Sequence, residues 1–398
     1  MTAPKRGPII LLAPRGSRFG PESATSIDLW MHEIARSSRF ADRLIMLAPE
    51  TPAPFEDVAL RFWPPGRAGR RAPALAQLAM TAGEAPPALI IVQQSLALAA
   101  GIAAQMAGQR TGLGKAPAPR IVLLRHNFAP PPRPGLTGAL SAWNRRRQYR
   151  RLDALAVVSA ACRDAFRSQW PGLADHPPLF VTPNGIDTGL WRPGPKRDRI
   201  LFVGRLAPEK GVAEALAACL ELLAQYPDWQ AQFVLDTRGA DPAYAARIEA
   251  QLAGAAPDLR ARVLLERNIP HDQVRAASAE AAIALAPTQG AEPFGRIALE
   301  AMASGAALVA TRAGGFVEIA EGASLLLESP TAAAIAEATA PLMADPEARR
   351  RLAAAGRARA EQRWSLSAAA EAFDRMAERV MARPAGGSTA VHPPTAAG

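Results

Sequence analysis

Short apolar runs alternate with Ala-rich segments through most of the 398-residue chain, and this alternation restricts the fold more than any other feature. The runs have the length of buried strands, and the segments between them are long enough to be crossing helices. The alternation therefore predicts an α/β fold with parallel sheets. We expect strands at residues 8–13, 44–47, 89–92, 120–125, 153–158, 199–203, 232–236, 261–265, 282–286, 307–311 and 324–327, and C-terminal helices at 331–343, 346–362 and 366–382.

Strong turn residues interrupt this rhythm near the middle of the chain. Residues 182–185 read Thr-Pro-Asn-Gly, and the Pro-rich stretch 191–195 follows. The length suits two domains, so we place the domains at 1–185 and 186–365. Residues 384–398 are small, polar and Pro-containing, and we expect a disordered tail there.

The positive charge of the chain is concentrated in its first half. Lys and Arg number 46 against 36 Asp and Glu, for a net charge of +10. Residues 1–185 hold 23 bases and 11 acids, and residues 101–150 hold nine bases and no acid. Such a field favours an anionic partner: a membrane surface, an acidic glycan, a phosphorylated lipid or nucleic acid. An Arg-rich proteome is the alternative explanation.

Two further features concern the cellular compartment. Cys162 and Cys219 form neither a disulfide framework nor a metal-ligand spacing, which favours buried thiols in a reducing cytoplasm. No apolar run approaches the roughly 20 residues that a membrane span needs. The N-terminal apolar stretch resembles a first buried strand more than a signal peptide. We therefore expect a cytoplasmic protein, with the inner face of the plasma membrane as a candidate peripheral site.

A nicotinamide enzyme is the first alternative for an α/β chain of this kind. Residues 13–20, after the first strand, lack the three-glycine spacing that a dinucleotide pyrophosphate requires. No acidic residue closes a second strand at the expected distance, and no P-loop is present. The sequence therefore gives little support to a dehydrogenase.

The second domain opens with a buried strand that ends at a glycine, Gly204, and continues into a turn with two cations, Arg205 and Lys210. Open α/β sheets bind ligands at the carboxyl ends of their strands. An arginine offers a planar fork to phosphate oxygens, and a lysine offers a mobile point charge. A solvated surface turn remains an alternative for this segment alone.

A second group of candidate residues follows the strand predicted at 282–286. Residues 290–305 contain a tight turn and then a helix that ends at Gly305. Backbone N–H groups at the start of such a helix can bind oxyanions or sugar hydroxyls. Glu292 lies on the turn, whereas Glu300 lies on the helix among apolar neighbours, where an ionised carboxylate needs hydrogen-bond donors. Ligand hydroxyls, the local backbone or an arginine could be those donors.

Taken together, four ordered segments resemble glycosyltransferase family 4, retaining enzymes built from two Rossmann-like domains (the GT-B fold). The segments are residues 182–187 (Thr-Pro-Asn-Gly-Ile-Asp), residues 203–211, the two glutamates Glu292 and Glu300 with seven residues between them, and residues 313–318 (Ala-Gly-Gly-Phe-Val-Glu). The resemblance implies a cleft between the domains, with acceptor binding by the first and donor binding by the second. It also implies a C-terminal helix, 366–383, that packs back on the first domain.

The resemblance also implies roles for single residues. Gly204 and the pair Arg205 and Lys210 would bind the diphosphate of a nucleotide-sugar donor. Glu292 would lie beside the transferred sugar, and Glu300 would accept hydrogen bonds from the ribose. The remaining donor contacts are assigned to the turn Phe294, Gly295 and Arg296.

Two candidates lie in the first domain. His126 follows the strand predicted at 120–125 and resembles the family histidine that approaches the donor sugar, although a lone histidine is more often structural. Gly20 is the best counterpart of the paired glycines that the family often has after its first strand. Because Gly20 is single and is followed by Pro21, the geometry of this loop toward the acceptor is left open.

The implied reaction moves a sugar from a nucleotide-diphosphate donor to a glycan, lipid-linked or other acceptor, in cell-envelope or exopolysaccharide synthesis. The alternatives are a transferase that makes a small soluble glycoside, and a non-catalytic scaffold that binds an anionic partner. The chain has no Asp-x-Asp site, so we expect no metal and no cofactor besides the donor. We prefer a front-face displacement, in which Glu292 orients the sugar, to a covalent route with Glu292 as nucleophile.

The basic segment 136–151 carries five arginines together with a tryptophan and a tyrosine. An amphipathic helix there would suit anionic lipid or an acidic acceptor, and a solvated charged helix is the alternative. No nucleic-acid-binding module accompanies the charge, so we do not expect a nucleic-acid partner.

Overall fold

The computed structural model describes residues 7–21, 24–63, 66, 71–110 and 118–383. Contacts divide the chain into two compact units. The first unit comprises Met1–Pro183 and Ala369–Gly398, and the second comprises Asn184–Ala368. The expected boundaries, after residues 185 and 365, lie within three residues of these. The tail expected at 384–398 lies outside the described residues.

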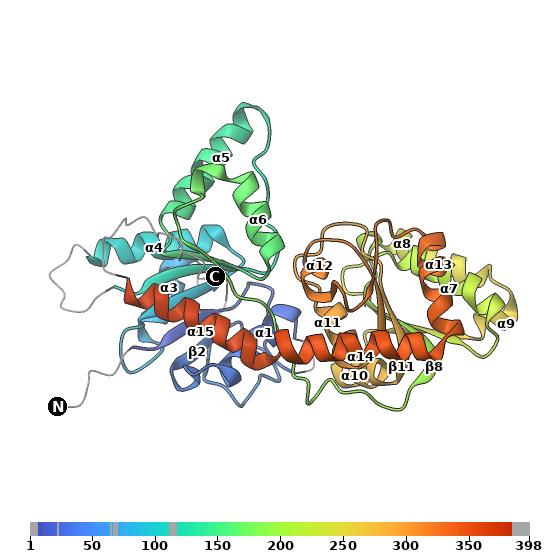
Figure 1. Ribbon diagram of the computed structural model, residues 1–398. Coiled ribbons are helices and arrows are strands. Elements are labelled where there is room, and N and C mark those ends of the chain that lie inside the picture. The colour runs from blue at the N-terminus through green and yellow to red at the C-terminus, as the bar shows by residue number, and fades with distance from the viewer. Residues whose placement is uncertain (1–6, 22–23, 64–65, 67–70, 111–117, 384–398) are drawn as a thin grey trace, which may run out of the picture. The chain divides into compact units, whose positions relative to one another are not determined.

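The first unit is built on a seven-stranded sheet in the order β3-β2-β1-β4-β5-β6-β7. Every neighbouring pair in this sheet is parallel. Its strands are β1 Ile9–Leu12, β2 Leu44–Ala48, β3 Leu60–Phe62, β4 Leu89–Gln93, β5 Arg120–Arg125, β6 Ala154–Val157 and β7 Leu179–Val181. Its helices are α1 Ser26–Ser37, α3 Ala72–Thr81, α4 Leu96–Arg110, α5 Gly135–Arg150 and α6 Ala160–Gln169, joined by most of α15 Leu366–Ala382 (Figure 1).

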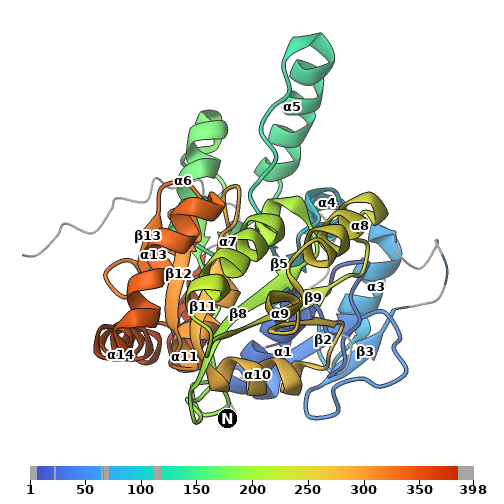
Figure 2. The same ribbon diagram turned by 90° about the vertical axis from the view of Figure 1, so that its right-hand side faces the viewer.

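The second unit has a six-stranded parallel sheet in the order β10-β9-β8-β11-β12-β13. Its strands are β8 Arg197–Arg205, β9 Gln230–Asp236, β10 Val263–Arg267, β11 Ala281–Ala286, β12 Ala307–Thr311 and β13 Leu325–Leu327. Its helices are α7 Val212–Gln225, α8 Pro242–Ala253, α9 Pro257–Arg260, α10 His271–Glu280, α11 Arg296–Ala303, α12 Gly315–Ala320, α13 Ala332–Ala344 and α14 Pro346–Arg363 (Figure 2).

Burial on both faces explains why the central strands are continuous apolar runs. All residues of β1, β4, β11 and β12 are buried. Helices cover both faces of each sheet (Figures 1 and 2), so neither face needs polar residues. In the second unit, Phe202 of β8 and Phe233 of β9 stack with their ring centroids 5.5 Å apart, within a core that includes Leu216 of α7. The α/β prediction with parallel sheets is confirmed.

Two strands were not predicted from the sequence. β3 and β7 have three residues each and lie at opposite edges of the first sheet. The residues of β3 are partly or fully exposed and those of β7 are only half-buried. An edge strand is covered less than a central one, so neither segment carries a long apolar run.

The two connections between the units run beside each other. Ile186 forms a parallel bridge with Ser365. The Ile186 N–H donates to the Trp364 carbonyl at 2.8 Å, and the Leu366 N–H donates to the Ile186 carbonyl at 3.1 Å. This short ladder begins directly after the predicted turn at 182–185, so the turn residues place the first connection against the second.

Helix α15 contacts the first unit through both apolar and polar groups. Phe373 is fully buried and packs edge-to-face on Trp30 of α1, with ring centroids 6.1 Å apart. The buried carboxylate of Asp374 accepts hydrogen bonds from the Ser38 hydroxyl and from the Arg39 N–H, which lie at the end of α1. Among the helices that the structure describes, none is long and apolar enough to cross a membrane.

We expect Asp374→Ala to lower the free energy of unfolding by about 1–3 kcal/mol, because it leaves the buried Ser38 hydroxyl without its acceptor. Amide exchange in residues 369–382 should accelerate as well. The matched control is Glu371→Ala on the exposed side of the same helix. Chemical denaturation followed by hydrogen exchange measures both effects. Equal stability of the two variants would contradict this account of how α15 is held.

Candidate functional site

The order of strands in the second sheet reverses at β8. β8 lies between β9 and β11, so the chain continues to one side after β8 and to the other side after β11. The connections that leave two such strands diverge and open a crevice at their carboxyl ends, where α/β sheets bind ligands. Residues 206–211 follow β8 and residues 287–295 follow β11. Both predicted motifs of the second unit therefore begin at this crevice.

The turn after β8 is fixed against the loop after β11. Gly211 has a left-handed backbone with φ of 71° and caps α7. A Cβ at this position would lie 2.0 Å from the Pro287 carbonyl oxygen, so only glycine fits. The Gln289 N–H donates to the Glu209 carbonyl at 2.9 Å. These contacts bring Lys210 beside the second loop.

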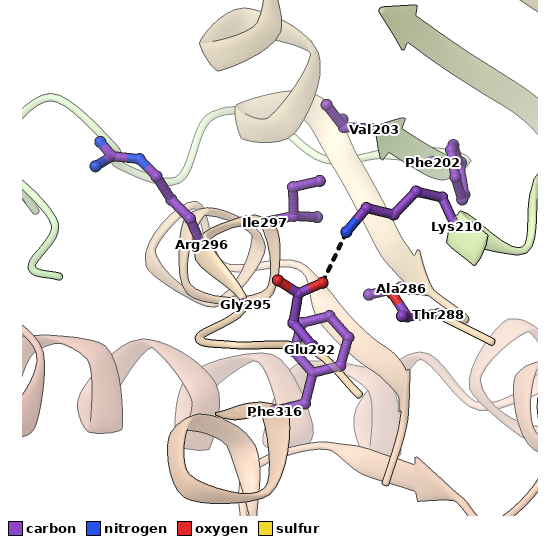
Figure 3. A pocket seen from close by; sticks show the side chains of 10 residues that line it. All are labelled: Phe202, Val203, Lys210, Ala286, Thr288, Glu292, Gly295, Arg296, Ile297 and Phe316. Atoms are coloured by element: carbon purple, nitrogen blue, oxygen red, sulfur yellow. Dashed lines mark hydrogen bonds and ion pairs between the residues drawn. The ribbon is translucent and has the colours of Figure 1, made fainter. Parts of the chain in front are cut away.

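Lys210 and Glu292 meet directly in the crevice. The Lys210 Nζ lies 2.7 Å from a carboxylate oxygen of Glu292, and their side chains are only 21% and 15% exposed (Figure 3). The two residues are 82 positions apart in the sequence. A partly buried pair is screened less by water and salt than a surface pair. The structure therefore places one predicted cation and one predicted acid in contact.

A pair of glycines holds the backbone of Glu292. The Gly315 N–H donates to the Glu292 carbonyl at 2.7 Å. Gly314 has φ of 51°, and a Cβ there would lie 2.2 Å from the same carbonyl oxygen. A side chain at 314 would thus push away the loop that carries Glu292. The predicted segment 313–318 acts as a support for this loop.

The turn before α11 has a similar requirement. Gly295 has φ of 104° and forms the N-cap of α11. A Cβ on Gly295 would lie 2.3 Å from the ring of Phe316, and Figure 3 shows that ring beside the turn. Phe294 is buried and packs edge-to-face on Trp364 at 5.6 Å. The start of α11 is therefore fixed at the wall of the crevice.

A pocket opens at this point, and its wall contains four of the predicted residues. Its lining residues are Phe202, Val203, Lys210, Ala286, Thr288, Glu292, Gly295, Arg296, Ile297 and Phe316. Thr288 and the apolar members of this set were not predicted as site residues. Phe316 belongs to a segment that was singled out, and Thr288 follows β11 within two residues, so their positions could have been inferred from the motifs around them.

Arg205 and Gly204 lie beside the pocket but do not line it. Gly204 is the penultimate residue of β8. The Arg205 guanidinium is 57% exposed and forms an ion pair of 2.8 Å with Glu209, four residues ahead. Such exposed pairs contribute little to stability. The side chain can therefore exchange this partner for another anion at small cost.

Glu300 has an arginine as its partner. The Arg296 Nε donates to a carboxylate oxygen of Glu300 at 2.9 Å, and both side chains are about 10% exposed. Figure 3 shows the Arg296 guanidinium pointing away from Lys210 and Glu292. In this structure the carboxylate of Glu300 therefore has the arginine donor that was one of the three alternatives from the sequence, and it does not line the pocket.

Gly20 belongs to the first unit, in the loop after β1. A Cβ on Gly20 would lie 1.9 Å from the Ala53 carbonyl oxygen, and the Gly20 N–H donates to the Arg18 carbonyl at 2.7 Å. The glycine is thus required by packing against the segment between β2 and β3, whatever the loop binds.

His126 also belongs to the first unit and lies just beyond the carboxyl end of β5. Its Nε2 is 2.9 Å from the Oε1 of Gln93, the last residue of β4, and its ring packs edge-to-face on Trp30 at 5.1 Å. Burial lowers the pKa of His126 to about 3, so the ring is neutral near pH 7. Gln93 was not predicted, and its position at the end of the neighbouring strand is the signal that could have indicated it.

The described residues contain no group of three or more His, Cys, Asp or Glu that could hold a metal ion.

Two family models match consecutive parts of the chain. Residues 32–190 match the model described as Glycosyltransferase Family 4, and residues 191–359 match the model described as Glycosyl transferases group 1. Together the two matches run through both units, and their junction after residue 190 lies seven residues beyond the first boundary between the units, after Pro183.

Curated proteins and solved structures agree with these matches. Alpha-maltose-1-phosphate synthase of Mycolicibacterium smegmatis is 32% identical over 256 residues, which span 58% of this chain and 64% of that protein, somewhat under two thirds of its length. A sucrose-phosphate synthase structure from Thermosynechococcus elongatus superposes with a TM-score of 0.72 at 20% identity, covering 95% of this chain and 100% of the other. Anabaena HepE, solved in complex with UDP, gives a TM-score of 0.72 at 19% identity and covers 94% of this chain and 100% of its own.

The sheet order, the full-length superpositions and the two consecutive family matches lead to one conclusion. The chain belongs to the family-4 type of glycosyltransferases, with the two-domain GT-B fold.

Proposed function

We propose that this glycosyltransferase transfers a sugar from a nucleotide-diphosphate donor, with retention of configuration and without a metal, to a glycan or lipid-linked acceptor in envelope or exopolysaccharide assembly. The observation that supports it most is the ion pair of Lys210 and Glu292 at the carboxyl ends of β8 and β11. HepE, which shares the fold, was solved with UDP and with UDP-glucose, and this favours a nucleotide-sugar donor.

Lys210 and Arg205 are the proposed partners of the donor diphosphate. In the structure each cation pairs with an acid: Lys210 with Glu292 and Arg205 with Glu209. The negative charge on a nucleoside diphosphate grows as the bond to the sugar breaks. Charge-assisted bonds from these cations stabilise that charge, at about 1.5–3 kcal/mol each. The cations thus make the diphosphate a better leaving group.

Glu292 is proposed to act on the sugar once Lys210 has turned to phosphate. In a front-face displacement, the bond between the anomeric carbon and the acceptor oxygen forms on the face from which the phosphate oxygen departs. The hydroxyl proton of the acceptor passes to the leaving phosphate. The Glu292 carboxylate then orients the sugar and stabilises positive charge at the anomeric carbon. Its fixed backbone, held by Gly315, suits an orienting role.

Glu300 is proposed to accept hydrogen bonds from the ribose hydroxyls, with Arg296 holding its carboxylate in place. The start of α11, with Phe294, Gly295 and Arg296, offers backbone groups to the sugar and phosphate. His126 is proposed to contact the donor sugar as a neutral ring. Its Nε2 faces Gln93.

A small soluble product is the second candidate. It is favoured by the similarity to a protein named for maltose-1-phosphate synthesis, which spans 58% of this chain. Partition of the radiolabelled product between butanol and water identifies a lipid-linked product, which enters the organic phase. Gel filtration of the aqueous phase then separates a glycan product from a small phosphorylated sugar.

We expect Lys210→Met and Glu292→Gln each to lower kcat/KM for transfer by about 10²–10³, because each removes charge at the reacting centre. Both should keep a melting temperature close to that of the unmodified protein. The control is Glu321→Gln, which removes a carboxylate from an exposed pair with Arg312 in the same unit. Transfer rates are measured with the nucleotide sugar that stabilises the protein most in a thermal-shift panel. Full activity of either site variant would refute the assigned site.

Glu300→Gln should raise the KM for a ribonucleotide donor about tenfold and leave kcat nearly unchanged, since the ribose is bound alike in ground and transition states. Glutamine keeps an acceptor for Arg296, whereas Ala would remove the carboxylate that pairs with this buried guanidinium. The comparison is a donor that lacks both ribose hydroxyls. For this donor the Glu300→Gln variant and the unmodified protein should have equal KM. An equal increase in KM for both donors would mean that Glu300 acts only through packing.

The lowered pKa of His126 has a defined consequence for stability. The unfolded chain binds a proton at this residue near pH 6.5, whereas the folded chain binds it only near pH 3. The free energy of unfolding therefore decreases as the pH falls from 6.5 toward 3, by at most about 1.4 kcal/mol per pH unit. We expect His126→Gln to reduce the difference in unfolding free energy between pH 7 and pH 4.5. An unchanged difference would show that His126 titrates normally in the folded protein.

A further inference from the structure

One end of helix α5 exposes large apolar side chains to solvent. Leu136 is 91% exposed, Leu140 67% and Trp143 51%. They are spaced four and three residues apart, so they lie along one face of the helix. In the described part of the chain only three other large apolar residues are as exposed as 40%: Phe62, Leu190 and Leu264, on separate elements or loops. α5 therefore presents the one concentrated apolar surface among these residues.

The other end of α5 is anchored firmly. Tyr149 is buried and packs on Phe166 of α6 at 5.2 Å and on Trp170 at 5.8 Å. At the apolar end, Gly138 lies against the loop that precedes α5, where a Cβ would come within 2.1 Å of the Arg133 carbonyl oxygen. In both views α5 projects away from the sheet of the first unit, with α6 beside its base (Figures 1 and 2). The exposed end is thus carried outward on a rigid support.

Arginines follow the apolar end along the helix. The Arg147 guanidinium lies over the Trp143 ring at 4.7 Å, and Arg146 lies over Trp170 at 5.8 Å. The basic residues of α5 are Arg145, Arg146, Arg147 and Arg150, and Arg151 caps the helix. Their separation from the leucines runs along the axis rather than around it, which differs from the amphipathic helix that was one of the two alternatives from the sequence. From Leu136 to Arg147 the helix rises about 16 Å.

This arrangement matches the layers of an anionic bilayer surface. Apolar side chains enter the boundary between headgroups and acyl chains, which amphipathic helices reach at a depth of about 5–10 Å. Arginines that follow by one to three turns meet the anionic headgroups, which attract basic side chains near the surface. A nucleic acid would use the arginines but leave the leucines in water. The absence of any acid from residues 101–150 removes repulsion from anionic lipid.

We propose that the exposed end of α5 docks this protein on an anionic membrane surface. Leu136, Leu140 and Trp143 enter the interface, and the arginines bind the headgroups. Three apolar side chains and a few arginines give reversible rather than permanent attachment. This proposal is independent of the sugar and of the residues assigned to transfer.

Vesicle co-sedimentation of the full chain tests the proposal. The vesicles are phosphatidylcholine with about 30 mol% phosphatidylglycerol, which provides the anionic surface, and pure phosphatidylcholine is the comparison. The protein should sediment with the first and remain in solution with the second. The triple variant L136S/L140S/W143S should lose at least about tenfold in partition coefficient, a small part of the transfer energy of three large apolar side chains.

Matched controls exist in the same chain. F62S/L190S/L264S replaces the three other exposed large apolar residues, and it should bind vesicles as the unmodified protein does. R145Q/R147Q/R150Q should weaken binding and its salt dependence, whereas R350Q/R351Q/R363Q, three exposed arginines of α14, should not. Each variant is checked for an unchanged melting temperature.

Three results would overturn the proposal. One is equal sedimentation with both kinds of vesicle. Another is binding of the α5 serine variant as tight as that of the control variant. The third is binding to double-stranded DNA that depends on the α5 arginines, without any binding to vesicles, since this would assign the surface to a nucleic acid.

Discussion

The position of β8 between β9 and β11 is the constraint on which the site depends. It sends the chain to opposite sides after β8 and after β11, so two loops that are about 80 residues apart in sequence begin at one crevice. Neither loop forms a site alone: the first supplies Lys210 and the second supplies Glu292. The chemistry proposed for the protein therefore depends on strand order, and a sheet in which β8 and β11 were not neighbours would separate these residues.

Close contacts between backbone atoms hold the loops after β8 and β11 in place, at positions where a side chain would not fit. Gly211 meets the Pro287 carbonyl, and Gly314 meets the Glu292 carbonyl, at distances that no Cβ would permit. These glycines have positive φ, so their conformation would be strained in any other residue. The ion pairs of the site form on this frame. Lys210 and Glu292 neutralise each other in the pocket, so a diphosphate that binds Lys210 would replace one anionic partner of this lysine by another.

The sequence predicted the sheets and the loops well because both depend on local patterns. Central strands are apolar runs, and most positions with positive φ are glycines. The edge strands β3 and β7 were not predicted, although the edge strands β10 and β13 were. β3 contains an arginine and β7 directly follows two prolines, so neither stands out as an apolar run in the way that β13 does. Side-chain partners were predicted only in part. The pairs Arg205 with Glu209 and Arg296 with Glu300 have helical spacing and were within reach of sequence reasoning, which considered only the second of them, as one alternative. The contact of Lys210 with Glu292 required the strand order.

The interpretation of helix α5 depends on how the fold holds it, and not on its sequence pattern alone. Around its axis, apolar and basic residues do not separate into two faces, so a periodicity argument alone favours a solvated helix. Tyr149 changes this, because its burial against Phe166 and Trp170 fixes the basic end and leaves the leucine end outermost. Leucines exposed this far cost free energy in water. An exposed apolar patch such as Leu136, Leu140 and Trp143 is typical of a site that binds an apolar partner. The arginines that follow these residues along α5 favour a partner that is also anionic.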